Sequence, residues 1–130
     1  MYIRKPDIFS QPSLEAARQV ILTTYAGYDS ELRWELETSE EISALRQLIP
    51  EHGKVCDFGI GIGRISRSLL EEMPCINIVG VDSSTAMLDY CRAYIPQELQ
   101  SRLELKSYED IGRIKSDSID FTLAIYVLQH

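Results

Sequence analysis

Residues 55–63 of the chain read Val-Cys-Asp-Phe-Gly-Ile-Gly-Ile-Gly, an apolar run that ends in an acid and continues into three alternating glycines. A second apolar run, residues 76–81, ends in a second acid, Asp82, which follows Gly59 by 23 residues. Glycine lets a backbone approach another group closely because it has no Cβ, and parallel sheets bind ligands beyond the carboxyl ends of their strands. The spacing therefore predicts a strand, a ligand-binding loop, a helix and a second strand, with both acids at one edge of a sheet.

Strand-like and helix-like patterns alternate from residue 54 onward. Short apolar runs predict strands, and apolar positions at helical spacing predict the helices between them. The predicted strands are residues 54–58, 76–81, 103–106 and 119–128, and the predicted helices are residues 63–72 and a helix from Ser83 or Ser84 to about residue 94. This alternation is typical of an α/β fold with a parallel sheet covered on both faces.

The residues before the first strand are predicted to be helical. Ser13 caps a helix that runs to Tyr25, a short helix follows over residues 31–37, and Ser39 caps another that Pro50 ends. We therefore divide the chain into an N-terminal helical segment, residues 1–38, and a core, residues 39–130.

Composition excludes several function classes. The net charge is -7 and the longest basic cluster is Arg4-Lys5, which disfavours a nucleic-acid partner because phosphate backbones are bound by clustered cations. No apolar run approaches the ~20 residues that cross a bilayer, and the N-terminus lacks the apolar core of a signal peptide, so we expect a cytoplasmic protein with no membrane contact. Cys56, Cys75 and Cys91 show no CxxC spacing, and no metal site is expected.

Two classes of nucleoside ligand remain open on the residues alone. Asp82 stands where nucleoside-binding sheets place a carboxylate on the ribose hydroxyls, and Gly63 begins a helix whose free N–H groups face the ligand. The dinucleotide pattern Gly-x-Gly-x-x-Gly puts its third glycine at position 64, which is Arg64 here. Asp57 opposes a diphosphate and favours an ammonium or sulfonium group.

On these residues the chain resembles the class I S-adenosylmethionine-dependent methyltransferases. The first motif is residues 55–63, the second is residues 80–84 followed by Met87 and Leu88, and a further motif is similar to residues 118–130. The resemblance covers roughly residues 39–130. It implies a Rossmann-like doubly wound parallel sheet in the order 3-2-1-4, truncated after strand 4, because complete members have seven strands.

The resemblance also implies a role for each site residue, with S-adenosylmethionine as the cofactor. Asp57 and the backbone of Gly59, Ile60 and Gly61 hold the methionine amino group, and Ala124 lies under the methionine moiety. Asp82 binds the ribose hydroxyls, Ser83 and Met87 flank ribose and adenine, and the backbone of Ser107 and Tyr108 meets the adenine edge. Many relatives carry an aspartate where Ser107 aligns, so Ser107, Glu109 or Asp110 takes over that contact here. The resemblance implies no particular catalytic residue, because methyl transfer from an activated sulfonium depends mostly on alignment of the reactants.

Residues 1–38 include the single tryptophan, Trp34. In some relatives an N-terminal segment folds over the cofactor, so Trp34 either covers the cofactor or packs in the core. We favour the core, because a lone large aromatic side chain is more often buried there.

Three functions follow from these patterns. The first is an S-adenosylmethionine-dependent methyltransferase that acts on a small molecule, with this chain as its cofactor-binding half. The alternatives are a non-catalytic methyltransferase-like module for cofactor binding or oligomerisation, and an NAD-dependent oxidoreductase. The bare apolar edge of the fourth strand leaves two interpretations open: either the chain is the ordered part of a longer protein, or that edge pairs with another copy or partner.

Overall fold

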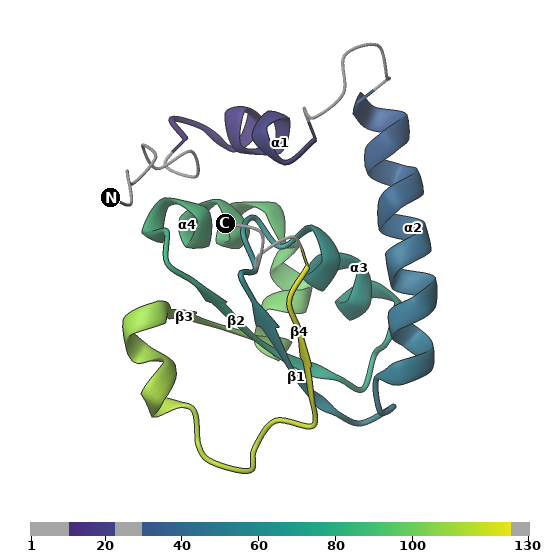
Figure 1. The fold of residues 1–130 in the computed structure, drawn as a ribbon, viewed down its shortest axis with the longest axis vertical. Helices are drawn as coiled ribbons and strands as arrows, with labels where there is room; N and C mark the ends of the chain where they lie inside the picture. Colours follow the sequence, from purple (N-terminus) through teal and green to yellow (C-terminus); the bar gives the residue numbers. More distant parts are fainter. Residues whose placement is uncertain (1–10, 23–29, 126–130) are drawn as a thin grey trace, which may run out of the picture.

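A parallel four-stranded sheet forms the centre of the computed structural model, which describes residues 11–22 and 30–125 (Figure 1). The strand order is β3-β2-β1-β4, as the resemblance implies. The strands are β1 (Lys54–Phe58), β2 (Asn77–Asp82), β3 (Leu103–Ser107) and β4 (Phe121–Leu123). The central strand β1 pairs with β2 on one side and β4 on the other, so the predicted α/β fold class is confirmed.

Two helices connect the first three strands. Helix α3 (Arg64–Glu72) links β1 to β2, and α4 (Thr85–Tyr94) links β2 to β3. Of the two predicted caps for α4, Ser84 is the one observed, and its hydroxyl accepts a hydrogen bond from the Met87 N–H. Right-handed crossovers place both helices over one face of the sheet.

Successive residues of each strand point to opposite faces of the sheet. Val55 and Ile78 belong to the large apolar cluster beneath α3 and α4, whereas Cys56 and Val79 belong to a smaller cluster with Ile114 and Ile119. This period of two places Asp57 on the face that α3 covers. The predicted strand over residues 119–128 is shorter in the structure, and residues 126–130 lie outside the described part.

The N-terminal helices are α1 (Leu14–Leu22) and α2 (Ser30–Leu48). The prediction of two helices across residues 31–49 is wrong, because Ser39 lies exposed within one continuous helix. The buried side chains of Trp34 and Ile42 hold both halves against the rest of the molecule, and this packing outweighs the local capping signal. The expected boundary between residues 38 and 39 therefore falls inside α2. The predicted end of the first helix, at Tyr25, lies outside the described residues.

Two short 3-10 helices flank β3. They are η1 (Gln97–Arg102) and η2 (Tyr108–Arg113), and the second lies between β3 and β4 in the chain. Arg102 donates to the carbonyl oxygens of Leu70, Met73 and Ile76, which satisfies backbone groups at the end of α3 and in its connection to β2. Within the described residues, no helix is both long and apolar enough to cross a membrane.

Candidate functional site

The loop between β1 and α3 holds three glycines in left-handed backbone conformations. Their φ angles are 79° at Gly59, 56° at Gly61 and 86° at Gly63, a region that costs other L-residues roughly 1–2 kcal/mol each. The N–H groups of Gly59 and Ile60 both donate to the Val81 carbonyl oxygen, at 2.7 and 3.0 Å. The loop is thereby attached to the carboxyl end of β2.

Gly63 is tightly packed, whereas Gly61 is not. A Cβ on Gly63 would lie 2.8 Å from Cys91 Sγ and 2.9 Å from Ile95 Cδ1, whereas a Cβ on Gly61 would meet no atom within 4 Å. Gly63 thus allows the start of α3 to approach α4 closely. Gly61 borders open space, as expected of a position where a ligand approaches the backbone.

Asp82 links the glycine loop to the start of α4. Its Oδ2 accepts a hydrogen bond from the Gly61 N–H at 2.9 Å, and its Oδ1 accepts one from the Ser84 N–H at 2.9 Å. A carboxylate has about four acceptor positions, so these two bonds leave others for further donors. The half-buried Asp82 side chain is therefore suited to receive two neighbouring hydroxyl groups.

Asp57 lies deeper, at 4% exposure, near the end of β1. Its Oδ2 accepts a hydrogen bond from Ser66 Oγ at 2.6 Å. Burial is the largest cause that raises the pKa of Asp57 to about 6, and the nearby charge of Asp82 adds to it; the Ser66 hydrogen bond and the Arg64 charge act in the opposite direction. The small exposed area limits any direct contact with a ligand, and the predicted contact to an amino group stays a prediction.

The register brings the remaining predicted residues to the same edge of the sheet. Ser107 stands opposite Asp82, and Ala124 directly follows the strand that pairs with β1. Ser83 and Ala124 are exposed, and so is Tyr108, whose ring meets Phe58 edge-on at 6.1 Å. Ser107 Oγ donates to Asp110 Oδ2 at 3.1 Å.

Met87 is buried, unlike the exposed Ser83, Tyr108 and Ala124. It is buried in a cluster with Ala17 of α1, Trp34 of α2 and Ile62 of the glycine loop. Trp34 is 7% exposed, so it packs in the core, as the favoured interpretation predicted. Met87 thus supports the loop from within, and its predicted contact with adenine is not tested by this packing.

Arg64 has a structural role that the sequence analysis missed. Its buried guanidinium donates to Thr38 Oγ1 at 2.8 Å and to Glu41 at 2.7 Å, and lies 5.7 Å from the centre of the Trp34 ring. These contacts connect α2 to the start of α3, directly after the glycine loop. Thr38 and Glu41 are one helical turn apart in the sequence, and residues at this spacing lie on the same face of a helix, where both can reach one partner.

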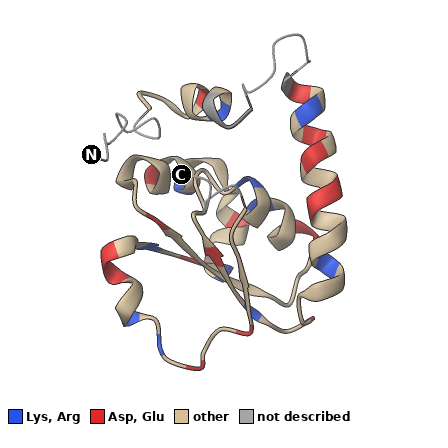
Figure 2. Ribbon diagram, in the orientation of Figure 1, with Lys and Arg blue, Asp and Glu red and all other residues tan. Residues whose placement is uncertain are grey.

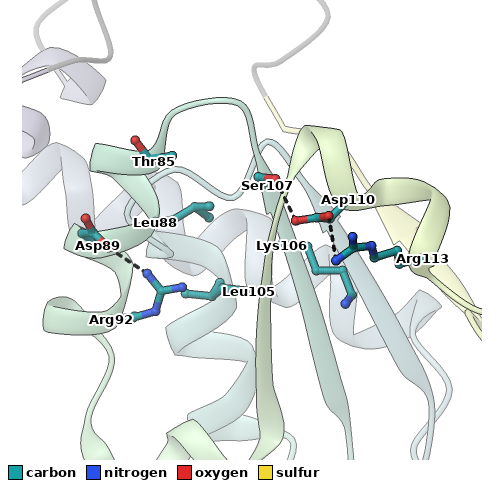
Figure 3. A pocket seen from close by; sticks show the side chains of 9 residues that line it. All are labelled: Thr85, Leu88, Asp89, Arg92, Leu105, Lys106, Ser107, Asp110 and Arg113. Atoms are coloured by element: carbon teal, nitrogen blue, oxygen red, sulfur yellow. Dashed lines mark hydrogen bonds and ion pairs between the residues drawn. The ribbon is translucent and has the colours of Figure 1, made fainter.

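A solvent-open cavity of about 340 Å³ lies beside the end of β3, between α4 and η2 (Figure 3). Its three cationic side chains are paired with acids: Arg92 with Asp89 at 2.8 Å, Lys106 with Glu104 at 2.8 Å and Arg113 with Asp110 at 3.2 Å. Ser107 also lines it, so the cavity adjoins the edge that carries the site residues. Among residues 11–22 and 30–125, no group of His, Cys, Asp and Glu side chains is arranged to bind a metal ion.

Comparison with known families decides what kind of domain this geometry belongs to. A family model described as a methyltransferase domain matches residues 55–130, which include the glycine loop and all four strands from Val55 onward. The chain belongs to this family. The match covers Asp57, Asp82 and Ser107, so the predicted site residues lie within the methyltransferase domain.

Individual proteins that are similar to this chain also carry methyltransferase names. A trans-aconitate 2-methyltransferase from Rhodopseudomonas palustris (strain HaA2) is 36% identical over 69 residues, which cover 52% of this chain and 27% of that protein. A coclaurine N-methyltransferase structure, bound to N-methylheliamine and SAH, matches with a TM-score of 0.59 at 14% identity, over 79% of this chain and 30% of that one. The methyltransferase domain of bacterial CtHen1-CN matches with a TM-score of 0.59 at 24% identity, over 72% and 51% of the two chains. The two structures support the fold, and the chain spans about a quarter to a half of these proteins.

Proposed function

We propose that this chain is the cofactor-binding half of an S-adenosylmethionine-dependent methyltransferase. The observation that carries the proposal is Asp82, a carboxylate held at the end of β2 by the N–H groups of Gly61 and Ser84. It lies in a methyltransferase domain, beside a glycine loop that borders open space at Gly61. This arrangement supports binding of a ribose next to a close-approaching backbone.

Each residue at the edge of the sheet has a proposed part in binding. Asp82 accepts the two ribose hydroxyls through its remaining acceptor positions. Asp57 supplies negative charge toward the ammonium group of the methionine moiety, and the backbone at Ser107 meets the adenine edge. Bound S-adenosylmethionine supplies an electrophilic methyl group on a sulfonium. The protein's contribution is to orient the reactants, because an activated methyl donor needs little more than alignment with its acceptor.

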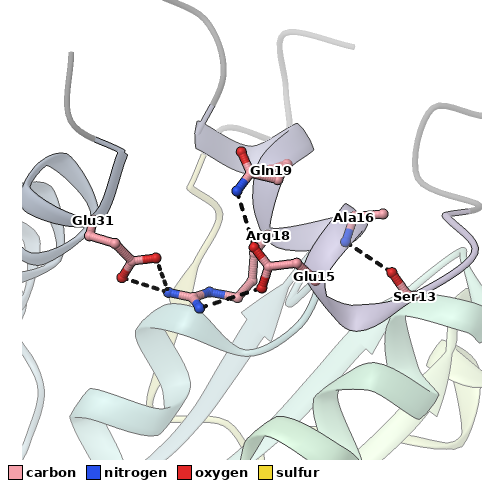
Figure 4. A network of polar contacts seen from close by, with 6 residues as sticks. All are labelled: Ser13, Glu15, Ala16, Arg18, Gln19 and Glu31. Atoms are coloured by element: carbon pink, nitrogen blue, oxygen red, sulfur yellow. Dashed lines mark hydrogen bonds and ion pairs between the residues drawn. The ribbon is translucent and has the colours of Figure 1, made fainter.

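Helix α1 is proposed to form part of a cover over this edge, one of the two roles that the sequence left open for the N-terminal segment. Arg18 of α1 donates to both carboxylate oxygens of Glu31 at 3.1 Å and lies near Glu15 (Figure 4). Its guanidinium also lies 4.9 Å from the centre of the Trp34 ring. These contacts hold α1 against α2, above the glycine loop and α4 (Figure 1).

The acceptor is proposed to be a small molecule. The net charge of -7 disfavours a nucleic-acid substrate, and acidic side chains are concentrated on α2 (Figure 2). Two of the similar proteins carry names of enzymes that act on small molecules, trans-aconitate and coclaurine.

Calorimetric titration of the chain with S-adenosylmethionine, S-adenosylhomocysteine and NAD tests the proposal. We expect micromolar binding of the first two and none of NAD, because Arg64 is fixed by Glu41 and Thr38 at the position of the third dinucleotide glycine. Binding of NAD alone would replace the proposal with an oxidoreductase. A chain that binds none of the three would contradict cofactor binding by this half.

A further inference from the structure

A fully buried serine, Ser66, lies in the first turns of α3 and directs its hydroxyl at the sheet. Serines inside helices commonly donate to a carbonyl oxygen of the preceding turn. The Ser66 hydroxyl instead donates across to Asp57 Oδ2 of β1, at 2.6 Å. A short hydrogen bond to a carboxylate is stronger than one between neutral groups, so this contact bears directly on the charge of Asp57.

Charges of both signs surround Asp57. Burial and the Asp82 carboxylate favour its neutral form, whereas the Ser66 hydroxyl and the Arg64 guanidinium favour its ionised form. Among the described residues, the Asp57 charge also affects the thiols of Cys56 and Cys91. The pKa values of both thiols are raised chiefly by burial and further by the charge of Asp57. Ser66 is therefore the one neutral group in this set that stabilises the carboxylate by donating a hydrogen bond.

We propose that Ser66 is a positioning residue for cofactor binding, whose hydroxyl keeps the Asp57 carboxylate ionised and oriented at the end of β1. The inference rests on the proposed function, in which the Asp57 charge attracts the cationic methionine moiety. A donor to the ionised form of a carboxyl favours ionisation. Ser66 thereby sets the pH below which the cofactor is released, although it has no contact with the cofactor itself.

Removal of the hydroxyl changes the pH dependence more than the maximum affinity. In Ser66→Ala, Asp57 keeps its burial and its neighbour Asp82 but loses a donor, so it holds its proton to higher pH. Loss of one charge-assisted hydrogen bond corresponds to an upward shift of about one pH unit. For a group that titrates near pH 6, the affinity for the cofactor then falls about fivefold at pH 6 and hardly changes at pH 8.5.

The test measures S-adenosylhomocysteine affinity by calorimetry from pH 5.5 to 9 for the wild type and four variants. Ser66→Ala is expected to shift the profile upward by about one pH unit, and Ser66→Thr, which retains the hydroxyl, to follow the wild type. Asp57→Asn is expected to abolish this pH dependence. Ser68→Ala is the matched control, since Ser68 lies half-buried on the same helix.

Two results would overturn the inference. One is a Ser66→Ala profile that coincides with the wild type, and the other is an equal loss of affinity at every pH, which a purely structural role would produce. Ser66→Cys, with nearly the same volume and a weaker donor, gives a smaller shift in the same direction if the alanine variant is poorly folded.

A second measurement separates this inference from the proposed function. The carboxyl-carbon NMR signal of Asp57 is titrated in the ligand-free wild type and in Ser66→Ala. A higher midpoint in the variant supports the role of Ser66 even if no cofactor binds, whereas equal midpoints refute it. Failure of the wild type to bind S-adenosylhomocysteine at any pH refutes the proposed function instead.

Discussion

Replacement of Gly63 by alanine is expected to destabilise the domain severely, for two separable reasons. The φ angle of 86° is strained for alanine, which costs roughly 1–2 kcal/mol. The new Cβ would lie 2.8 Å from Cys91 Sγ and 2.9 Å from Ile95 Cδ1. Both side chains are buried and cannot withdraw into solvent, so overpacking adds about 1–3 kcal/mol. The expected loss in free energy of unfolding is about 2–5 kcal/mol.

Urea unfolding followed by circular dichroism provides the measurement, with two other glycines as matched controls. Gly61→Ala carries the strain without the contacts, because no atom lies within 4 Å of its Cβ, so about 1–2 kcal/mol is expected. Gly112→Ala has neither strain nor contacts, and about 0.5 kcal/mol or less in either direction is expected. A loss at Gly63 no larger than that at Gly61 would refute the close packing of the loop on α4.

A double variant identifies the contact responsible. Cys91→Ala removes the sulfur that a Cβ at position 63 meets, so the two substitutions together are expected to cost less than the sum of their separate effects. Coupling of about 0.5–3 kcal/mol is typical of residues in direct contact. Strict additivity would assign the loss to backbone strain or to Ile95.

Three further outcomes follow from the polar contacts. Asp82→Ala should weaken S-adenosylmethionine binding by about 1.5–3 kcal/mol in calorimetry; an unchanged affinity would show that the ribose is bound elsewhere. Arg64→Ala, which leaves the partly buried Glu41 unpaired, should lower the free energy of unfolding by about 3 kcal/mol, against less than about 1 kcal/mol for Arg46→Ala at an exposed pair. The pKa of Asp57 is about 6 in the native state, raised from 3.8. As pH rises from about 4 to 6, the carboxyl is therefore ionised in the unfolded state before it is ionised in the native state, and the free energy of unfolding decreases. Asp57→Asn should therefore gain stability relative to the wild type across that window, by up to about 3 kcal/mol at pH 8; a difference that is constant with pH would contradict this account.

The strands and the glycine loop could be predicted because their signals are local. Apolar runs of strand length, an acid at the end of each and glycines at alternate positions specify the β1–loop–α3 unit without reference to the rest of the chain. The strand order was not available from periodicity and came from the resemblance to a family. The family match over residues 55–130 agrees with that resemblance.

The features that could not be predicted depend on how distant elements pack. Ser39 carries a capping signal, yet α2 continues through it because Trp34 and Ile42 are buried on either side. The hydrogen bond between Ser66 and Asp57 depends on which side of α3 faces the sheet, and the sequence pattern does not determine that orientation closely enough. Met87 is buried against Ala17 of α1 and Trp34 of α2, contacts that depend on how these helices pack on α4. In each case tertiary contacts override or add to a local preference.

The two-sided pairing of β1 has a consequence for amide hydrogen exchange. Strand β1 lies between β2 and β4, whereas β3 is at the edge of the sheet among the described strands. The first two amides of the glycine loop donate to Val81, inside the same paired region. Exchange at Gly59 and Ile60 therefore requires the opening that exposes the middle of the sheet, while edge amides exchange through smaller local openings. The amides of Gly59 and Ile60, in the loop proposed to bind the cofactor, are thus expected to be among the last of the domain to exchange.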